Sequence, residues 1–217
     1  FALSFHPLFI GGDPFHVTSM YALVSHLERA FGVHYAMGGV RVDGDSQMSC
    51  VPGLFAAGEC AAGLHGANRL GGNSLSDLLV FGKRAGEFAA AFAKEHGAVT
   101  LDDRHVDAAA NTALAPLERQ SASPNGEGPY QIQYALQDMM QDLVGIVRNQ
   151  ADMLRAVDGI KKLRERADRV VALGNREYNP GWHTALDLDN LLIVSEAIAL
   201  AGIERNESRG AHFREDF

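Results

Sequence analysis

A glycine-rich stretch over residues 58–75 carries the side chains best suited to chemistry. Glycines stand at positions 58, 63, 66, 71 and 72, and glycine allows positive φ and a close approach of the backbone to a flat ligand. Glu59 follows a short apolar run, a place where nucleotide-binding folds commonly hold a ribose or ribityl hydroxyl. Arg69 is a fixed cation that can take a carboxylate through two parallel hydrogen bonds. The stretch therefore predicts a site for a flat ligand beside a site for a carboxylate.

A long helix is expected directly after this loop, over about residues 73–95, and closed by Gly97. Its apolar positions recur at helical spacing, at Leu75, Leu78, Leu79, Phe81 and Phe88. The backbone amides of Ser74 and Leu75 would open the helix, so its positive dipole end would face the loop. Such an end stabilises negative charge, for example that around N1 and O2 of a reduced flavin.

The remaining pattern predicts an α+β chain, with a strand–glycine loop–helix segment followed by an all-α bundle. Residues 33–42 are apolar and β-branched around a glycine pair, which indicates strand, turn and strand, and residues 51–59 indicate a turn and a short buried strand. Residues 97–128 are rich in Ser, Pro, Asp and Gly. The helical pattern covers residues 102–120, 132–147, 153–173 and 186–201.

Composition excludes several classes of protein. The 217 residues are 47% hydrophobic and 21% charged, with a formal net charge of −8, so an electrostatic grip on nucleic acid is not expected. The two cysteines, Cys50 and Cys60, give neither a disulfide scaffold nor a cysteine-rich metal site, and they fit a reducing compartment. The nine histidines show no paired spacing with carboxylates, so no metal site is predicted.

Several motifs, in one order along residues 33–217, closely resemble the flavoprotein subunit of succinate dehydrogenase and fumarate reductase, in the superfamily of L-aspartate oxidase. They are His34-Tyr35-Ala36-Met37-Gly38-Gly39, Gly53-Leu54-Phe55-Ala56-Ala57-Gly58-Glu59, His65-Gly66-Ala67-Asn68-Arg69-Leu70-Gly71-Gly72-Asn73-Ser74-Leu75 and Glu207-Ser208-Arg209-Gly210-Ala211-His212-Phe213-Arg214-Glu215-Asp216-Phe217. Tyr178-Asn179-Pro180 and the helix after it resemble the same subunit.

The resemblance implies FAD as cofactor and a C4 dicarboxylate, succinate or fumarate, as substrate. It implies that His34 and Arg69 hold one carboxylate of that substrate. It implies hydride transfer between the flavin and the substrate, with electrons passed to an iron–sulfur subunit, a membrane anchor and quinone. The protein is then expected in the cytoplasm, on the inner face of the cell membrane. The implied FAD contacts are Gly58, Glu59, Asn73, Ser74 and Leu75.

The chain also departs from the family pattern. The family's Gly-x-Gly-x-x-Gly nucleotide motif and its proton-shuttling arginine lie upstream of the His-x-x-x-Gly-Gly strand, and neither has a match here, so no catalytic residue is assigned. We therefore expect the C-terminal part of a larger flavoprotein, inactive alone. Residues 1–32 would be a helical segment of uncertain origin, either the end of a capping region or joined across a gap. Residues 33–102 would be part of the FAD-binding domain, and residues 103–217 a helical domain.

Two other functions stay open. An L-aspartate oxidase shares most of these motifs but tends to have Met-Ala-Ser-Asn-Ser after the loop arginine, where this chain has Leu70-Gly71-Gly72-Asn73-Ser74. Alternatively, residues 103–217 serve as a helical interaction module without catalysis. His65 either lines the site or packs the loop. Arg209 and His212 either reach the site or, the reading we favour, fix the helical domain against the flavin domain.

Overall fold

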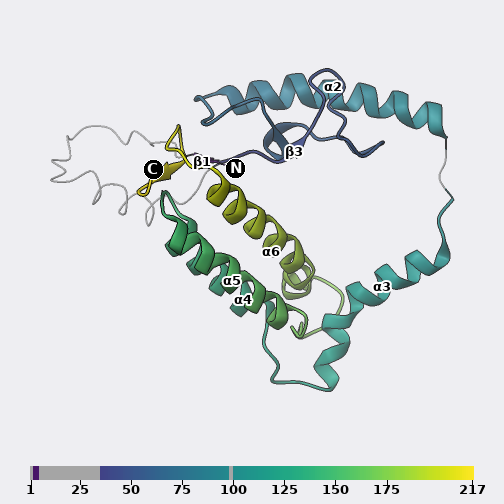
Figure 1. Ribbon diagram of the computed structural model, residues 1–217. Coiled ribbons are helices and arrows are strands. Elements are labelled where there is room, and N and C mark those ends of the chain that lie inside the picture. The colour runs from purple at the N-terminus through teal and green to yellow at the C-terminus, as the bar shows by residue number, and fades with distance from the viewer. Residues whose placement is uncertain (1, 5–34, 98–99) are drawn as a thin grey trace, which may run out of the picture. The chain divides into compact units, whose positions relative to one another are not determined.

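The computed structural model describes residues 2–4, 35–97 and 100–217, which form two compact units of an α+β chain (Figure 1). The first unit holds the described residues up to 97, together with Asn206–Glu215 and Phe217. The second unit holds residues 100–205 and Asp216. The α+β prediction is confirmed. Of the predicted helical segment 1–32, only the strand β1 (Ala2–Ser4) lies inside the described residues.

Two small sheets support the glycine loop in the first unit. Strand β1 pairs antiparallel with β2 (Tyr35–Met37), with Leu3 opposite Ala36. Strand β3 (Val40–Arg41) pairs parallel with β4 (Ala61–Ala62). The strands predicted within residues 33–42 are present, but they pair with other segments and not with each other.

The glycine pair between these strands explains that pairing. Gly38 and Gly39 have φ of 131° and 125°, which L side chains rarely adopt. A Cβ on Gly39 would lie 2.1 Å from the carbonyl oxygen of Cys60. Only glycine allows this approach, so the pair turns the chain from one sheet into the other.

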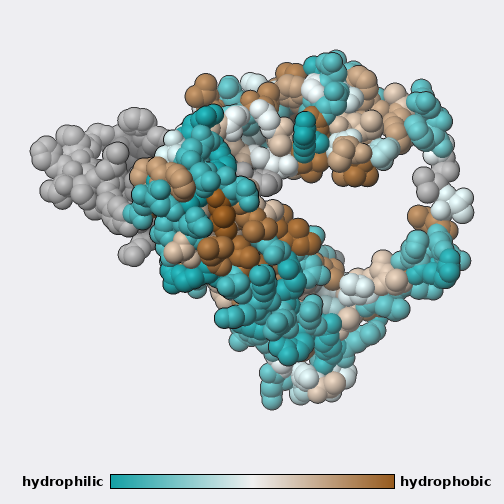
Figure 2. Space-filling view, in the orientation of Figure 1, coloured by the Kyte–Doolittle hydropathy of each residue, from teal (hydrophilic) through white to brown (hydrophobic). Residues whose placement is uncertain are grey.

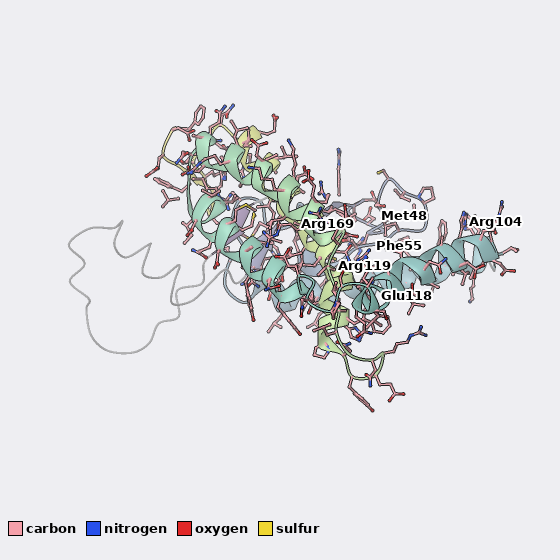
Figure 3. All side chains as sticks on the ribbon, turned by 90° about the horizontal axis from the view of Figure 1, so that it is seen from below. Met48, Phe55, Arg104, Glu118, Arg119 and Arg169 are labelled. Carbon is pink, nitrogen blue, oxygen red and sulfur yellow. The ribbon has the colours of Figure 1, made fainter. Side chains whose placement is uncertain are left out.

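The prediction of a buried strand before Gly58 is wrong. Met48 and Phe55 form an isolated antiparallel bridge (Figure 3), and no longer strand follows them. The chain instead enters a single 3-10 turn, η1 (Gly58–Cys60), in which Gly58 has φ of 78°. Glu59 therefore stands in a helical turn and not at the end of a strand.

Helix α2 (Asn73–His96) confirms the long helix expected after the loop. Gly72, with φ of 81°, precedes it, and the amide of Gly97 donates to the carbonyl of Ala93 at its end. Lys94 and His96 lie in the last turn, where positive charge complements the helix dipole.

The second unit is built on three helices that pack side by side (Figure 1). These are α4 (Pro129–Val144), α5 (Gln150–Ala167) and α6 (Pro180–Glu204), and their buried core holds Ile132, Leu136, Ile160, Leu163, Leu188 and Leu192. Helix α3 (Asp103–Glu118), the short η2 (Arg119–Ser121) and strand β5 (Val147–Arg148) complete the unit. All the helices predicted beyond residue 102 are present.

Local sequence signals account for where these helices begin. The side chains of Asp102, Asn149 and Asn179 accept from the amides of residues two or three positions later, as N-caps do. Pro129 and Pro180 stand in the first turns of α4 and α6.

Helix α5 stops at Ala167, earlier than the predicted residue 173, because the next residues are held elsewhere. Val171 donates its amide to the carbonyl of Glu127, and Ala172 donates to that of Pro116, each at 2.9 Å. Val170, Val171 and Ala172 are buried in this extended stretch.

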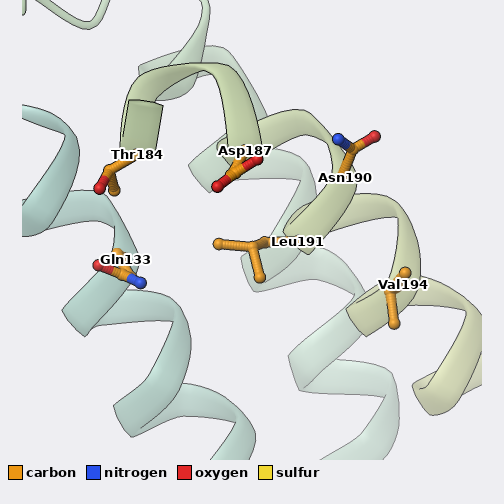
Figure 4. A pocket seen from close by; sticks show the side chains of 6 residues that line it. All are labelled: Gln133, Thr184, Asp187, Asn190, Leu191 and Val194. Carbon is orange, nitrogen blue, oxygen red and sulfur yellow. The ribbon is translucent and has the colours of Figure 1, made fainter. Parts of the chain in front are cut away.

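Hydrophobic residues gather over α6 (Figure 2), where Ile193 and Val194 are exposed at 58% and 55%. A groove of about 310 Å³ lies between α4 and α6 (Figure 4). It is lined by Gln133, Thr184, Asp187, Asn190, Leu191 and Val194. Among these six residues, only Asp187 has an ionisable side chain, so they do not include a pair of side chains suited to acid–base catalysis. Among the described residues, no helix combines the length and apolarity needed to cross a bilayer.

The C-terminal segment packs with the glycine loop, whereas residues 103–217 were predicted to form one helical domain. The amide of Ala211 donates to the carbonyl of Ala67 at 3.1 Å, and Ala211 packs against Tyr35 and Met37. Two hydrogen bonds join Ser208 to Arg214 in strand β6 (Phe213–Arg214). The Ser208 hydroxyl donates to the Arg214 carbonyl, and the Arg214 amide donates to the Ser208 hydroxyl, so the chain between them folds back on itself. Long-range contacts, which periodicity does not reveal, make this segment part of the first unit.

Gly210→Ala is expected to loosen this contact. Gly210 has φ of 61°, and a Cβ there would lie 2.4 Å from the carbonyl oxygen of Ala67. Strain of this kind costs about 1–3 kcal/mol, so amides of residues 65–72 should exchange with solvent faster, as measured by hydrogen exchange. Gly44→Ala is the control, because no heavy atom in the described part of the chain lies within 4 Å of its Cβ position. Equal exchange in the two variants would contradict the assigned contact.

Acid should weaken the second unit through Glu127. The Arg166 guanidinium donates hydrogen bonds to this carboxylate, one of them from Nε at 3.1 Å, and holds the pKa of Glu127 below its ordinary value near 4.5. The pair stabilises the fold fully above that ordinary value, and the stabilisation is lost as the pH falls through the lower folded pKa.

Glu127→Gln should therefore flatten the acid limb of a plot of unfolding free energy against pH. Glu165→Gln, an exposed carboxylate on α5, is the control and should leave that limb unchanged. An acid limb of the same slope in Glu127→Gln and the parent would refute the linkage.

Candidate active site

The loop between η1 and α2 presents an open, glycine-lined surface. Gly63, Gly66 and Gly72 have φ of 110°, 57° and 81°, and no heavy atom of the described residues lies within 4 Å of a Cβ built on any of them. A cavity of about 340 Å³ adjoins the loop, lined by Val42, Gly44, Gln47, Gly58, Ala61, Ala62, Gly63, Leu64, Asp77 and Phe81. The backbone of this loop is therefore accessible to a flat ligand.

Arg69 is the buried cation of the site. Its side chain is 5% exposed, its Nη1 donates to the carbonyl of Leu70 at 3.3 Å, and its Cζ lies 4.5 Å from the ring centroid of Tyr35. Within the part of the chain that the structure describes, Arg69 has no carboxylate partner and its buried Nε has no hydrogen-bond acceptor. A buried, unpaired guanidinium is suited to bind an anion.

Tyr35, beside Arg69, begins a chain of three buried polar side chains. The Tyr35 hydroxyl lies 3.2 Å from Nε2 of His65, and the same nitrogen lies 3.2 Å from Oδ2 of Asp77. Tyr35 is 6% exposed, and the His65 and Asp77 side chains are 9% and 4% exposed. The rings of Tyr35 and His65 meet edge to face, with centroids 5.5 Å apart.

The environment keeps Tyr35 neutral. Burial, followed by the negative charges of Asp77 and Glu59, raises the pKa of the Tyr35 phenol, against the opposing effect of Arg69. Hydrogen bonding to Asp77 raises it further. Tyr35 therefore acts as a hydroxyl donor and as an aromatic face, and not as a phenolate.

Glu59 is fixed by a strand as well as by its own turn. Its Oε1 accepts the amide of Ala36 at 2.8 Å, and the residue is exposed. At the start of α2, the amides of Asn73 and Leu75 donate to the carbonyls of Leu70 and Gly72, each at 3.2 Å. The first turn of α2 is thus tied into the loop by its own hydrogen bonds.

The structure brings most of the predicted site residues into one unit. Gly58, Glu59, Arg69, Asn73, Ser74 and Leu75 all lie on η1, the loop and the start of α2. His34 lies outside the described residues. His65 packs the loop through its bonds to Tyr35 and Asp77.

The sequence prediction missed two residues of the site and did not decide the roles of two others, Arg209 and His212. Tyr35 and Asp77 were not predicted; a hint was available for Asp77, a carboxylate on the same helical face as Phe81. Arg209 and His212 pair through their backbones, with the Arg209 amide donating to the His212 carbonyl at 2.8 Å, and His212 is buried.

The loop passes a simple test of fit to FAD. The glycine backbone of the loop is accessible to a ligand, and the N-terminal, positive end of α2 adjoins the loop. The buried Nε of Arg69, which has no acceptor among the described residues, could donate to an anionic group nearby. Sequence comparison agrees, because residues 14–75 match the family model of an FAD binding domain. The prediction of FAD as the family's cofactor is confirmed.

Comparison with known proteins extends this agreement to the rest of the chain. Residues 133–217 match the family model described as fumarate reductase flavoprotein C-term. The fumarate reductase flavoprotein subunit of Haemophilus influenzae is 44% identical over 187 residues, which are 85% of this chain and 31% of that protein. The succinate dehydrogenase flavoprotein subunit of Coxiella burnetii is 38% identical over 198 residues, 85% of this chain and 33% of that protein.

A solved structure agrees in fold as well as in sequence. The Mycobacterium smegmatis Sdh1 complex in the apo form contains a chain 47% identical to this one, with a TM-score of 0.80. The match covers 85% of this chain and 31% of that chain. The chain thus spans about a third of the length of the curated relatives it matches. It belongs to the family of fumarate reductase and succinate dehydrogenase flavoprotein subunits.

Proposed function

We propose that the protein works as the flavoprotein subunit of a succinate dehydrogenase or fumarate reductase, interconverting succinate and fumarate with FAD. The observation that carries the proposal is Arg69, which is buried without an ion-pair partner in the described chain and stands in the Gly66-Ala67-Asn68-Arg69 loop. The relatives named for these two activities support it.

Arg69 supplies binding and polarisation in this proposal. Its guanidinium would hold one carboxylate of the dicarboxylate through charge-assisted bonds, together with His34. The low dielectric around a 5%-exposed side chain strengthens that attraction. A cation fixed at one carboxylate also draws electron density from the adjacent carbon–carbon bond, which stabilises charge that develops in the transition state.

The residues around the loop would hold the cofactor. Gly58, Glu59, Asn73, Ser74 and Leu75 are the proposed contacts, with Glu59 on a hydroxyl of the cofactor and the start of α2 near its ring. FAD, when bound, supplies hydride exchange at its N5 atom. The proton-moving group of the reaction is not assigned to a residue of this chain.

Electron transfer partners follow from the same proposal. One relative is titled as a complex, the Sdh1 complex of Mycobacterium smegmatis, which supports assembly with other subunits. We propose an iron–sulfur subunit as the acceptor of the electrons, linked through a membrane anchor to quinone, and a position on the inner face of the cell membrane. Residues 33–102 remain our proposed part of the FAD-binding domain, and residues 103–217 our proposed helical domain, although residues 206–215 of the latter pack with the first unit.

The alternative enzyme, an L-aspartate oxidase, is disfavoured by the residues after Arg69. The run Leu70-Gly71-Gly72-Asn73-Ser74 has the form that the dehydrogenases tend to have. Turnover with aspartate and oxygen that exceeds turnover with succinate and an artificial acceptor would reverse this choice.

Arg69→Lys is the direct test of the dicarboxylate site. Lysine keeps the charge but loses the planar fork, so affinity should fall about 10–100-fold, as expected for the loss of one charge-assisted bond of about 1.5–3 kcal/mol. The measurement is the Kd for malonate of the FAD-loaded larger flavoprotein to which we expect this chain to belong. Malonate has a single CH2 group between its two carboxylates, so it binds as a dicarboxylate but cannot be dehydrogenated.

Arg104→Lys is the matched control. Arg104 pairs with Asp102 on the surface, with its own side chain 89% exposed, so the change should leave the Kd unaltered. The same Kd in Arg69→Lys and the parent would show that Arg69 does not bind the dicarboxylate, and the proposed function would lose its support.

A further inference from the structure

A chain of three buried polar residues ends at Tyr35, against Arg69, and has no part in the proposed chemistry. Asp77 lies in the second turn of α2, His65 in the loop, and Tyr35 on β2. Each of these side chains is at least nine-tenths buried. Burying so many polar groups is costly unless each one is hydrogen-bonded, so their arrangement calls for a physical role.

The three side chains form one chain of contacts. The Tyr35 hydroxyl lies 3.2 Å from Nε2 of His65, and the same nitrogen lies 3.2 Å from Oδ2 of Asp77. The carboxylate on one side and the hydroxyl on the other therefore hold the same imidazole nitrogen.

Tyr35 transmits this constraint to Arg69. Its ring face lies under the guanidinium, with Cζ 4.5 Å from the centroid, while its hydroxyl end lies 3.2 Å from Nε2 of His65. Among the described residues, the guanidinium also donates a hydrogen bond to the carbonyl of Leu70 at 3.3 Å. The orientation of the guanidinium therefore depends on the orientation of the Tyr35 ring together with this carbonyl.

We propose that Asp77, His65 and Tyr35 are positioning residues that hold Arg69 for its anionic ligand. Asp77 orients His65, His65 holds the Tyr35 hydroxyl, and the Tyr35 ring orients the guanidinium. This inference rests on the proposed function, because it assigns the network to the carboxylate site of Arg69. The three residues touch neither substrate nor cofactor in this assignment.

The test compares Tyr35→Phe and Asp77→Asn with the control Asp138→Asn, an exposed carboxylate on α4. Tyr35→Phe keeps the ring under Arg69 and removes its anchor. The Kd for malonate of the FAD-loaded protein should rise about 2–10-fold in both network variants, the effect of one lost hydrogen bond, and stay at the parent value in the control. In succinate oxidation by the larger flavoprotein to which we expect this chain to belong, kcat/KM should fall at least as far as the affinity for malonate, because Arg69 both binds the carboxylate and stabilises charge in the transition state.

A double-mutant cycle separates positioning from a structural role. If Tyr35 acts through Arg69, Tyr35→Phe should add little to the Kd of Arg69→Lys, whereas independent effects would multiply. Multiplicative effects, or unchanged Kd in Tyr35→Phe, would overturn the inference. Asp77→Asn changes a buried carboxylate and is the variant more prone to misfold. If Asp77→Asn does not fold, the Kd of Tyr35→Phe decides between the outcomes. An unaffected Kd in Arg69→Lys would overturn the proposed function itself, so the two failures are distinguishable.

Discussion

The burial of the Arg69 charge is the constraint on which the glycine loop depends. Removing a guanidinium from water costs several kcal/mol unless other groups compensate. Here the compensation comes from the Tyr35 ring and one carbonyl, while Nε keeps no acceptor within the described residues. A protein that stabilises itself alone would pair or expose this charge. A site that must receive an anion keeps the guanidinium buried and lacking one partner.

The C-terminal segment serves the same constraint from the far end of the chain. Residues 206–215 pack with the first unit, so residues 100–205 are an insertion between two parts of that unit. Ala211 donates to the carbonyl of Ala67, two positions before Arg69, and packs on Tyr35. Ala211 therefore contacts both the loop backbone at Ala67 and the Tyr35 ring that lies against Arg69, although it is far from both in the sequence.

Local physics explains what the sequence could predict. Helices α2 to α6 follow from apolar spacing, and α3 to α6 also have an N-cap side chain or a proline at the helix start. All these interactions lie inside one segment. Strand partners are not local. Residues 33–42 looked like one hairpin, but β2 and β3 pair with β1 and β4, and the run before Gly58 gave only a bridge. The return of residues 206–215 was hidden for the same reason.

The site shows the same division between what is written in a motif and what the fold assembles. Arg69 and Glu59 stood out because their neighbours repeat a family pattern. Tyr35 and Asp77 lie 42 positions apart in the numbering of the sequence, and they meet through His65 only after β2 and α2 have packed. Glu59 adds a case of its own: Oε1 accepts the Ala36 amide of β2, while Oε2 has no acceptor role among the described bonds. One oxygen thus holds the strand that carries Tyr35, so the carboxylate that we propose as a cofactor contact also fixes the strand whose ring lies against Arg69.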